Sequence, residues 1–290
     1  MTKEETDFYS APGPLTNPGR HAGLIRELPQ ELAPLVRAIQ GCNLHAWWAK
    51  AYEVELTEER KAELQIRPIE ERIDRLLALD SRPLVQTRPA GRRLFGTCRD
   101  FTLFLCSVLR SRGIPARCRC GFATYFEVDR FEDHWLCEVW MPEEGRWRLV
   151  DAQIDSLMRS RLGLDFDTLD VPRDRFFCGG EAWQLCRSRR VDPARFGIFD
   201  MHGLGFVRGD LVRDLLALNS VEVLPWDCWG IVAKKDEDVD AADLALLDQI
   251  AEVTSIAHHV EGTPDIFERL RGFLLEHPEL RAPADLIRVA

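Results

Sequence analysis

The segment GTCRDFTLFLCSVLRSRG, residues 96–113, constrains the fold more than any other part of the sequence. Thr97 and Asp100 have the T-x-x-D spacing of a capping box, so we expect a helix that begins at Cys98 and ends before Gly113. This helix is apolar on nearly every side, and such a helix is stable only when other layers enclose it. With 290 residues, the chain is long enough to build those layers.

Cys98 lies in the first turn of the predicted helix. A thiol there faces unpaired backbone N–H groups and the positive end of the helix dipole, which can lower its pKa to about 3.5–7.5. We therefore predict that Cys98 is a nucleophile at neutral pH. The alternative is a small buried core residue, which is what we expect for the other eight cysteines, and the helix by itself favours that alternative.

Strand patterns follow this helix. In the segment IPARCRCGFATYF, two arginines alternate with Cys118, Cys120 and Phe122. A period of two predicts a strand with one buried face.

The next stretch, residues 134–153, predicts a β-hairpin that turns around Pro142–Gly145. If the loop is 142–145, His134 faces Gln153 and Asp151 is its diagonal neighbour. If the loop is 141–144, His134 faces Asp151 directly. Both registers place His134 and Asp151 on one face of the sheet, whereas an odd loop without a bulge would separate them.

A thiol, an imidazole and a carboxylate can form a catalytic relay. The carboxylate fixes the imidazole tautomer, and the imidazole takes the proton from the thiol. Taken singly, His134 is more simply a half-buried strand histidine and Asp151 a strand-end cap. Their combination with Cys98 at a helix start favours a Cys-His-Asp relay.

The segments GTCRDFTLFLCSVLRSRGIPARCRCGF, DHWLCEVW and GRWRLVDAQ together resemble the transglutaminase-like superfamily over about residues 91–153. The family pattern has G-x-C at a helix start, a G-I-P-A-R strand entry, H-x-W-x-E-V-W and W-x-x-V-D. The flanks VPRDRFFCGGEAWQLCR and LVRDLLALNSVEVLPWDCWG resemble those of a bacterial group of transglutaminase-domain proteins.

The resemblance implies an α+β fold with a papain-like core, in which a central helix packs against an antiparallel sheet between helical N- and C-terminal flanks. It implies Cys98 as nucleophile, His134 as general base and acid, and Asp151 as the residue that orients His134. The family's oxyanion hole uses the nucleophile's backbone N–H and an upstream donor, commonly Trp or Gln. Gln86 lies upstream of Cys98, but its surroundings match no motif, so this donor stays unassigned.

The reaction implied is thioester formation on an amide, resolved by water in a protease, amidase or deamidase. Amine transfer by a transglutaminase is one alternative, and a non-catalytic binding protein that keeps the fold is another. We favour hydrolysis because the chain shows helical flanks and no credible calcium loop. From Asp236, D-E-D-V-D-A resembles an EF-hand start, but Ala241 replaces the required Gly and Leu247 the bidentate Glu.

Four regions are predicted along the chain. Residues 1–23 are rich in proline and lack periodicity, which indicates an extended arm. Residues 24–90 have helical spacing and predict an N-terminal lobe, and residues 91–155 hold the catalytic core. Residues 156–290 predict a mainly helical region packed on the core, with helices at about 181–190, 209–219, 241–257 and 264–276.

Charge and hydropathy limit the partners. The net charge of −10 disfavours nucleic acid and anionic membranes. The longest apolar run, Phe101–Leu109, is too short to cross a bilayer, and the N-terminus lacks the apolar stretch of a signal peptide. We therefore expect a cytoplasmic protein that acts on a protein, peptide or small amide; its oligomeric state is open.

No cofactor or metal is expected. His258 and His259 have no second ligand pair, and the sequence GLGFVRG at 203–209 lacks the third glycine of a dinucleotide fingerprint. Eight arginines between residues 88 and 119 face a single acid, Asp100, and predict a local basic patch. This patch could steer an anionic substrate or nucleic acid to the Cys98 face, but solvation and the helix dipole are sufficient to explain it. The eight are Arg88, Arg92, Arg93, Arg99, Arg110, Arg112, Arg117 and Arg119.

Overall fold

The predicted central helix is α6, Cys98–Arg110, and every one of its residues is buried. The capping box is present, with the Thr97 backbone N–H donating to Asp100 Oδ2 over 2.8 Å. The helix packs against the sheet, where the Thr102 hydroxyl donates to the Trp135 carbonyl over 2.9 Å. The computed structural model describes residues 1–259 and 264–287, so residues 260–263 and 288–290 of the predicted C-terminal region lie outside the described residues.

The main sheet has six strands in the order β6-β3-β4-β7-β8, with β5 paired to β4. Most pairings are antiparallel, but β4 and β7 run parallel, so the predicted antiparallel sheet is mixed. The short strands β1 and β2 form a separate parallel pair. The strands are β1 Asn43–His45, β2 Leu94–Gly96, β3 Ala116–Ala123, β4 Phe131–Met141, β5 Arg146–Val150, β6 Phe176–Cys178, β7 Phe196–Ile198 and β8 Met201–His202.

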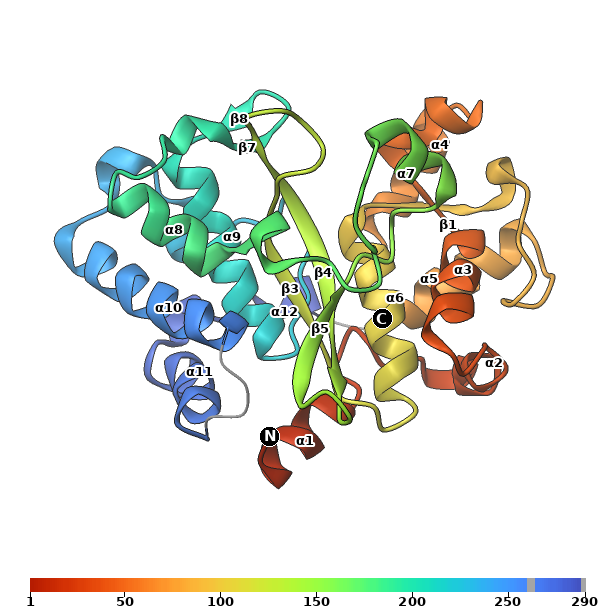
Figure 1. The fold of residues 1–290 in the computed structure, drawn as a ribbon, viewed down its shortest axis with the longest axis horizontal. Coiled ribbons are helices and arrows are strands. Elements are labelled where there is room, and N and C mark those ends of the chain that lie inside the picture. Colours follow the sequence, from red (N-terminus) through yellow and green to blue (C-terminus); the bar gives the residue numbers. More distant parts are fainter. Residues whose placement is uncertain (260–263, 288–290) are drawn as a thin grey trace.

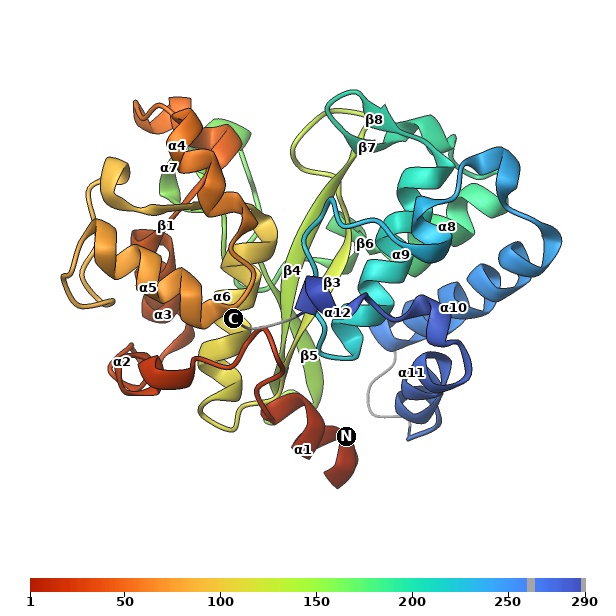
Figure 2. The same ribbon diagram turned by 180° about the vertical axis from the view of Figure 1, so that it is seen from behind.

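Helices cover both sides of this sheet. Figure 1 shows α2–α6 on one side and α8–α11 on the other, and the reverse view in Figure 2 agrees. The fold is therefore α+β, with the sheet between two helical layers. Besides α6, the helices are α1 Lys3–Ser10, α2 Ala22–Arg26, α3 Leu32–Cys42, α4 Glu58–Lys61, α5 Ile69–Leu79, α7 Ser156–Leu162, α8 Gly179–Arg187, α9 Leu204–Leu218, α10 Ala241–His259, α11 Pro264–Glu276 and α12 Ala284–Ile287.

The β4–β5 hairpin adopts the first of the two predicted registers. Met141 pairs with Arg146, so the loop is Pro142–Gly145, and Gly145 has a φ of 66° that a glycine adopts without strain. The last pair is Cys137 with Val150. Asp151 therefore follows directly after the end of β5.

The strand predicted in the segment IPARCRCGFATYF is present as β3, but the prediction that only one of its faces is buried is wrong, because all eight residues are buried. The basic patch is wrong for the same reason: five of the eight arginines are buried, so they form no surface to recognise an anion. Arg110 pairs with Glu222 over 2.8 Å, and Arg119 pairs with Asp214 over 2.9 Å. The acidic partners come from segments more than 90 residues away, which a local charge count cannot detect.

The predicted extended arm at residues 1–23 is also wrong. It contains α1, capped by the Thr2 side chain, which accepts from the Glu5 backbone N–H. Tyr9 is fully buried, and its hydroxyl donates to the Leu218 carbonyl over 3.0 Å. Its ring centroid lies 5.5 Å from that of Trp147 on β5. The arm folds because aromatic residues at its start bury against the sheet.

The cysteines are mostly core residues, as expected. All nine are free thiols, and eight of them are buried while Cys228 is exposed. Among the described residues, no helix combines the length and apolar character needed to cross a membrane.

Candidate active site

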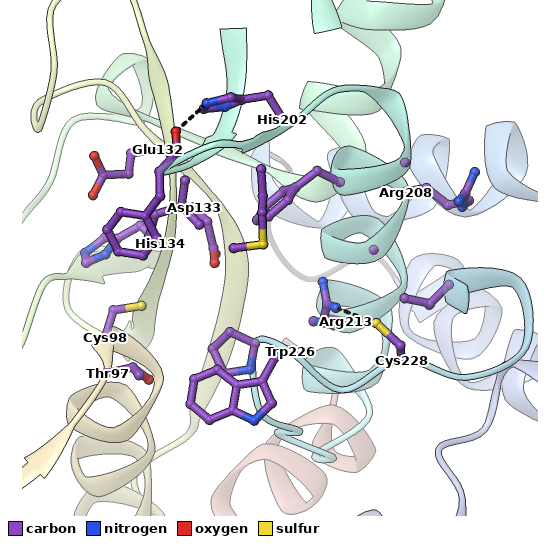
Figure 3. A pocket seen from close by; sticks show the side chains of 18 of the residues that line it. Thr97, Cys98, Glu132, Asp133, His134, His202, Arg208, Arg213, Trp226 and Cys228 are labelled. Carbon is purple, nitrogen blue, oxygen red and sulfur yellow. Dashed lines mark hydrogen bonds between the residues drawn. The ribbon is translucent and has the colours of Figure 1, made fainter. Parts of the chain in front are cut away.

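Cys98 opens on a cavity of about 520 Å³ that His134 also lines. Only 6% of Cys98 is exposed, so a substrate must enter the cavity to reach it. Figure 3 shows Cys98 at the start of α6, below the His134 ring on β4. On the opposite side of the cavity lie Arg208 and Arg213 of α9.

The structure contradicts the predicted low pKa of Cys98. Burial raises the pKa of this thiol well above its ordinary value, and the nearby Asp133 carboxyl raises it further. The backbone N–H groups of Trp135 and Arg99 favour the thiolate, but they do not offset burial. The helix start is thus outweighed by the loss of water around the sulfur, and the thiol is protonated at neutral pH. A base must therefore remove this proton when Cys98 reacts.

His134 is held by Asp151. Its Nε2 lies 2.9 Å from Asp151 Oδ2, which also accepts from the Tyr125 hydroxyl over 2.7 Å. The other oxygen, Oδ1, accepts from the backbone N–H groups of Gln153 and Ile154 over 3.0 and 3.3 Å. These contacts fix the carboxylate in one position, so the predicted proximity of His134 and Asp151 is confirmed.

The charges of this pair determine the histidine tautomer. Burial alone would raise the pKa of Asp151, but the interaction with His134 and the bonds from Tyr125 and Gln153 outweigh it and lower this pKa. An ionised carboxylate only accepts hydrogen bonds, so Nε2 carries the proton of the neutral ring. Nδ1 is then the nitrogen that can exchange a proton in the cavity.

Within the part of the chain that the structure describes, Cys98 Sγ makes no hydrogen bond to the His134 ring. The two groups line one cavity without a hydrogen bond between them in the described part of the chain. A longer separation in a protein without substrate is common and does not exclude proton transfer after substrate binds.

His45 lines the same cavity as Cys98, and the sequence analysis missed it. His45 on β1 pairs with Gly96 on β2. Gly96 lies two residues before Cys98, so this pairing brings His45 close to the start of α6. Burial and, to a smaller extent, the nearby His134 lower the pKa of His45 to about 3, so the ring is neutral. Its Nδ1 is buried without a hydrogen-bond partner among the described residues. Gln86, in contrast, is exposed and does not line the cavity.

Tyr125 and Phe126 are two more residues that the sequence analysis missed. Both follow β3 in a loop, and the Phe126 ring centroid lies 4.9 Å from that of His134. Tyr125 holds Asp151 through its hydroxyl. No local pattern marks either residue, because the contacts depend on how the loop returns over the hairpin.

The buried carboxyl of Asp133 lines the cavity, and the buried carboxyl of Asp210 lies close to it. Ligand atoms of Asp133, Asp210 and Cys120 are within 4.8 Å of one another. Burial raises the pKa of Asp133 well above its usual range and that of Asp210 to about 6, although Arg213 donates to Asp210 over 3.0 Å. Asp133 Oδ1 and Asp210 Oδ2 have no hydrogen-bond partner among the described residues. Two carboxyls this close disfavour each other's ionisation, which agrees with the direction of the Asp133 shift.

Donor groups that could hold a metal ion occur in two places. One is the set of Asp133, Asp210 and Cys120, and the other is Cys178, Glu181 and His258, from β6, α8 and α10. The second set corrects the expectation that His258 has no neighbouring ligands. Each set lies beside arginine side chains that already supply positive charge: Arg213 in the first, and Arg119 and Arg173 in the second. The absence of a bound metal from this protein stays a prediction.

The mouth of the cavity is apolar. Seven large hydrophobic side chains are exposed in the described part of the chain, and four of them line this cavity. The ring centroids of Trp47 and Phe199 lie 5.4 Å apart, although one residue follows β1 and the other lies between β7 and β8. The four are Trp47, Phe199, Met201 and Trp226.

Comparison with protein families agrees with this geometry. Residues 50–152 match the model of the transglutaminase-like superfamily. The chain therefore carries a transglutaminase-like domain, as the motifs predicted, and Cys98, His134 and Asp151 all lie within the matched residues. Members of this superfamily are usually cysteine-based enzymes. Neither a curated protein nor a solved structure matches the chain.

Proposed function

We propose that this protein is a thiol enzyme that forms a thioester between Cys98 and the acyl group of an amide, and that water then hydrolyses the thioester. The observation that carries the proposal is the His134–Asp151 pair, held at 2.9 Å and opening on the same cavity as Cys98. The transglutaminase-like domain supports the same chemistry.

In the first step, His134 Nδ1 takes the proton of the Cys98 thiol as the sulfur attacks the amide carbonyl carbon. The carbonyl oxygen becomes an oxyanion, and the amine then leaves with the proton from His134. In the second step, His134 takes a proton from water while the hydroxyl attacks the thioester. The sulfur leaves, regains the proton, and the acid is released. Asp151 stabilises the imidazolium in both steps.

The raised pKa of Cys98 makes His134 a general base that acts during the attack. Because the thiol is protonated at rest, its proton moves to His134 as the bond between sulfur and carbon forms. The reactivity of Cys98 should then depend strongly on His134.

The oxyanion needs donors. The backbone N–H of Cys98 lies at the start of α6, where helix N–H groups are unpaired. We propose His45 as the second donor, because its neutral ring lies beside the helix start and Nδ1 has no other partner. A single such donor is worth about 10²–10³-fold in rate.

Hydrolysis is favoured over amine transfer. The acidic stretch at 236–243 is the segment that resembles the start of a calcium loop. In it Asp236 pairs with Arg208 and Asp243 with Lys234, so protein cations already engage these carboxylates. Water needs no second binding site, whereas transfer needs a cleft that excludes water and admits an amine.

The test is acylation of the protein by 4-nitrophenyl acetate, with the modified thiol mapped by mass spectrometry. We expect acetyl-Cys98, no label there in Cys98→Ala, and acylation at least about 100-fold slower in His134→Asn. Cys228 is exposed and serves as the internal reference thiol. Preferential labelling of Cys228 with Cys98 unmodified would refute the proposal. Deacylation in millimolar methylamine then separates hydrolysis from transfer, since methylamide product in excess of acetate would reverse our choice.

A further inference from the structure

We propose that the cavity at Cys98 binds an apolar, ring-sized acyl group of the substrate, and that Trp47, Phe199, Met201 and Trp226 select for it. The inference rests on the proposed function, because the acyl group is what Cys98 carries as a thioester. It adds the chemical class of the substrate.

The first argument is where the exposed apolar side chains lie. Trp47, Phe199, Met201 and Trp226 are 48%, 55%, 53% and 38% exposed, and all four line one cavity. Exposed apolar side chains that are gathered in one place mark a site that binds a ligand or a partner. Their gathering around one opening, and not over the whole surface, points to an apolar ligand that enters there.

The second argument is the size of the cavity. A volume of about 520 Å³ falls within the roughly 300–1,000 Å³ of small-molecule pockets. It accommodates one bulky side chain or a small amide, and it is too small for a folded protein surface. The occupant is therefore a compact group, presented either by a small molecule or by a single side chain or chain end of a peptide.

The third argument is that the apolar walls come from separate parts of the chain. Trp47 follows β1, Phe199 lies in the turn between β7 and β8, and Trp226 follows α9. Trp47 and Phe199 meet in a ring contact at 5.4 Å, and Phe199 has a φ of 55°, which a non-glycine residue rarely adopts. Backbone strain of this kind persists where the surroundings hold it, and here it keeps an aromatic ring at the mouth.

Three of the cations that line the cavity are already paired, whereas Lys235 and Glu132 line it without an ion pair among the described residues. Arg208 pairs with Asp236, Arg213 with Asp210, and Lys234 with Asp243. An uncharged acyl group therefore gains contact with the aromatic walls without disrupting an ion pair.

The experiment compares two esters that share one leaving group, 4-nitrophenyl acetate and 4-nitrophenyl 3-phenylpropanoate. Second-order rates of Cys98 acylation are divided by the rates of the same esters with glutathione. We expect the wild-type protein to prefer the phenylpropanoate by about 10- to 100-fold, the range for an apolar group in a fitted pocket. Trp47→Ala and Phe199→Ala should each lower this ratio several-fold, and Trp47→Phe should keep most of it.

The matched control is Val128→Ala, which truncates a side chain that is 90% exposed and does not line the cavity. This variant should leave the ratio unchanged. The proposed acyl-binding pocket is overturned if the normalised ratio is near one in the wild-type protein. It is also overturned if the Trp47→Ala/Phe199→Ala double variant keeps the wild-type ratio. Failure of both esters to acylate Cys98 overturns the proposed function instead.

Discussion

Strand β4 carries two buried ionic clusters that differ in how completely their charges are paired. At Glu138, both oxygens accept from arginines: Oε2 from Arg117 and Arg119 over 2.6 and 3.2 Å, and Oε1 from Arg173 over 2.5 Å. At Asp133, five residues earlier, Oδ1 has no partner, and its neighbour Asp210 receives one arginine.

The pKa values follow this difference. Burial would raise the pKa of Glu138, but three arginines outweigh it and hold this pKa well below the usual range. The pKa of Asp133 is raised well above its usual range. The pKa values of two buried carboxyls on one strand are thus shifted in opposite directions, depending on the number of cations nearby. The Glu138 cluster stabilises the fold, whereas the Asp133 cluster lies in the cavity wall and keeps unpaired groups beside Cys98.

Replacing Glu138 should have the largest effect. Glu138→Gln leaves Arg117, Arg119 and Arg173 without their shared carboxylate in a buried site, and we expect a loss of about 3–5 kcal/mol in the free energy of unfolding. Urea unfolding measures it. Asp133→Asn, on the same strand, should cost under about 1 kcal/mol because it removes a carboxyl that is already poorly paired. A similar loss in both variants would contradict the comparison.

The pH dependence of stability should differ in sign between the clusters. The folded pKa of Asp210 is about 6, above its ordinary value of 3.8, so the folded state holds this proton more tightly. Its contribution falls as pH rises from about 4 to 6, by on the order of 2 kcal/mol. Glu138 has a lowered pKa, so its contribution is present above about pH 4.5 and is lost as pH falls.

Urea unfolding between pH 4 and 7 compares wild-type protein with Asp210→Asn. The free energy of unfolding of the variant should not show the fall with rising pH that Asp210 causes in the wild type. At pH 7 the variant's stability should approach or exceed that of the wild type. An unchanged pH profile would mean that Asp210 is ionised in the folded protein throughout this range.

The reactivity of Cys98 should report the charge of Asp133. Asp133→Asn removes a carboxylate that raises the pKa of Cys98, so alkylation by iodoacetamide should be about three- to tenfold faster at pH 9. An unchanged alkylation rate at Cys98 would contradict this role of the Asp133 carboxylate.

Arg173→Gln should have the smallest effect. The Arg173 side chain is 29% exposed, and Glu138 still pairs with Arg117 and Arg119 when Arg173 is replaced. We expect a loss of about 1 kcal/mol in the free energy of unfolding. Arg187→Gln, which breaks the exposed pair with Asp248, is the control and should change stability by less than about 0.5 kcal/mol. A loss above about 3 kcal/mol for Arg173→Gln would mean that the cluster has no spare cation.

Much of the site could be predicted from the sequence because its signals are local. The capping box of Thr97 and Asp100 determines where α6 begins, and a helix start is specified by a few adjacent residues. The hairpin loop Pro142–Gly145 sets the register that brings His134 near Asp151. The motif spacing predicted the transglutaminase-like domain for the same reason.

The electrostatics could not be predicted in this way. The sequence alone suggests that Arg110 and Arg119 belong to a surface patch. In the structure they pair with Glu222 and Asp214, which are far from them in the sequence. The pKa of Cys98 was predicted from its helix start alone, but burial by β4 and the cavity wall raises it. His45 and Tyr125 carry no motif and reach the site only through chain packing.

The sequence by itself therefore determined where α6 starts, the spacing of Cys98, His134 and Asp151, and the domain they belong to. Tertiary structure decided which charges are buried, which are paired, and which side chains enclose the cavity. The physical reason is how far apart in the sequence the interacting residues lie. Caps, turns and strand periodicity depend on residues a few positions apart, whereas desolvation and ion pairing depend on whatever segments pack around a group.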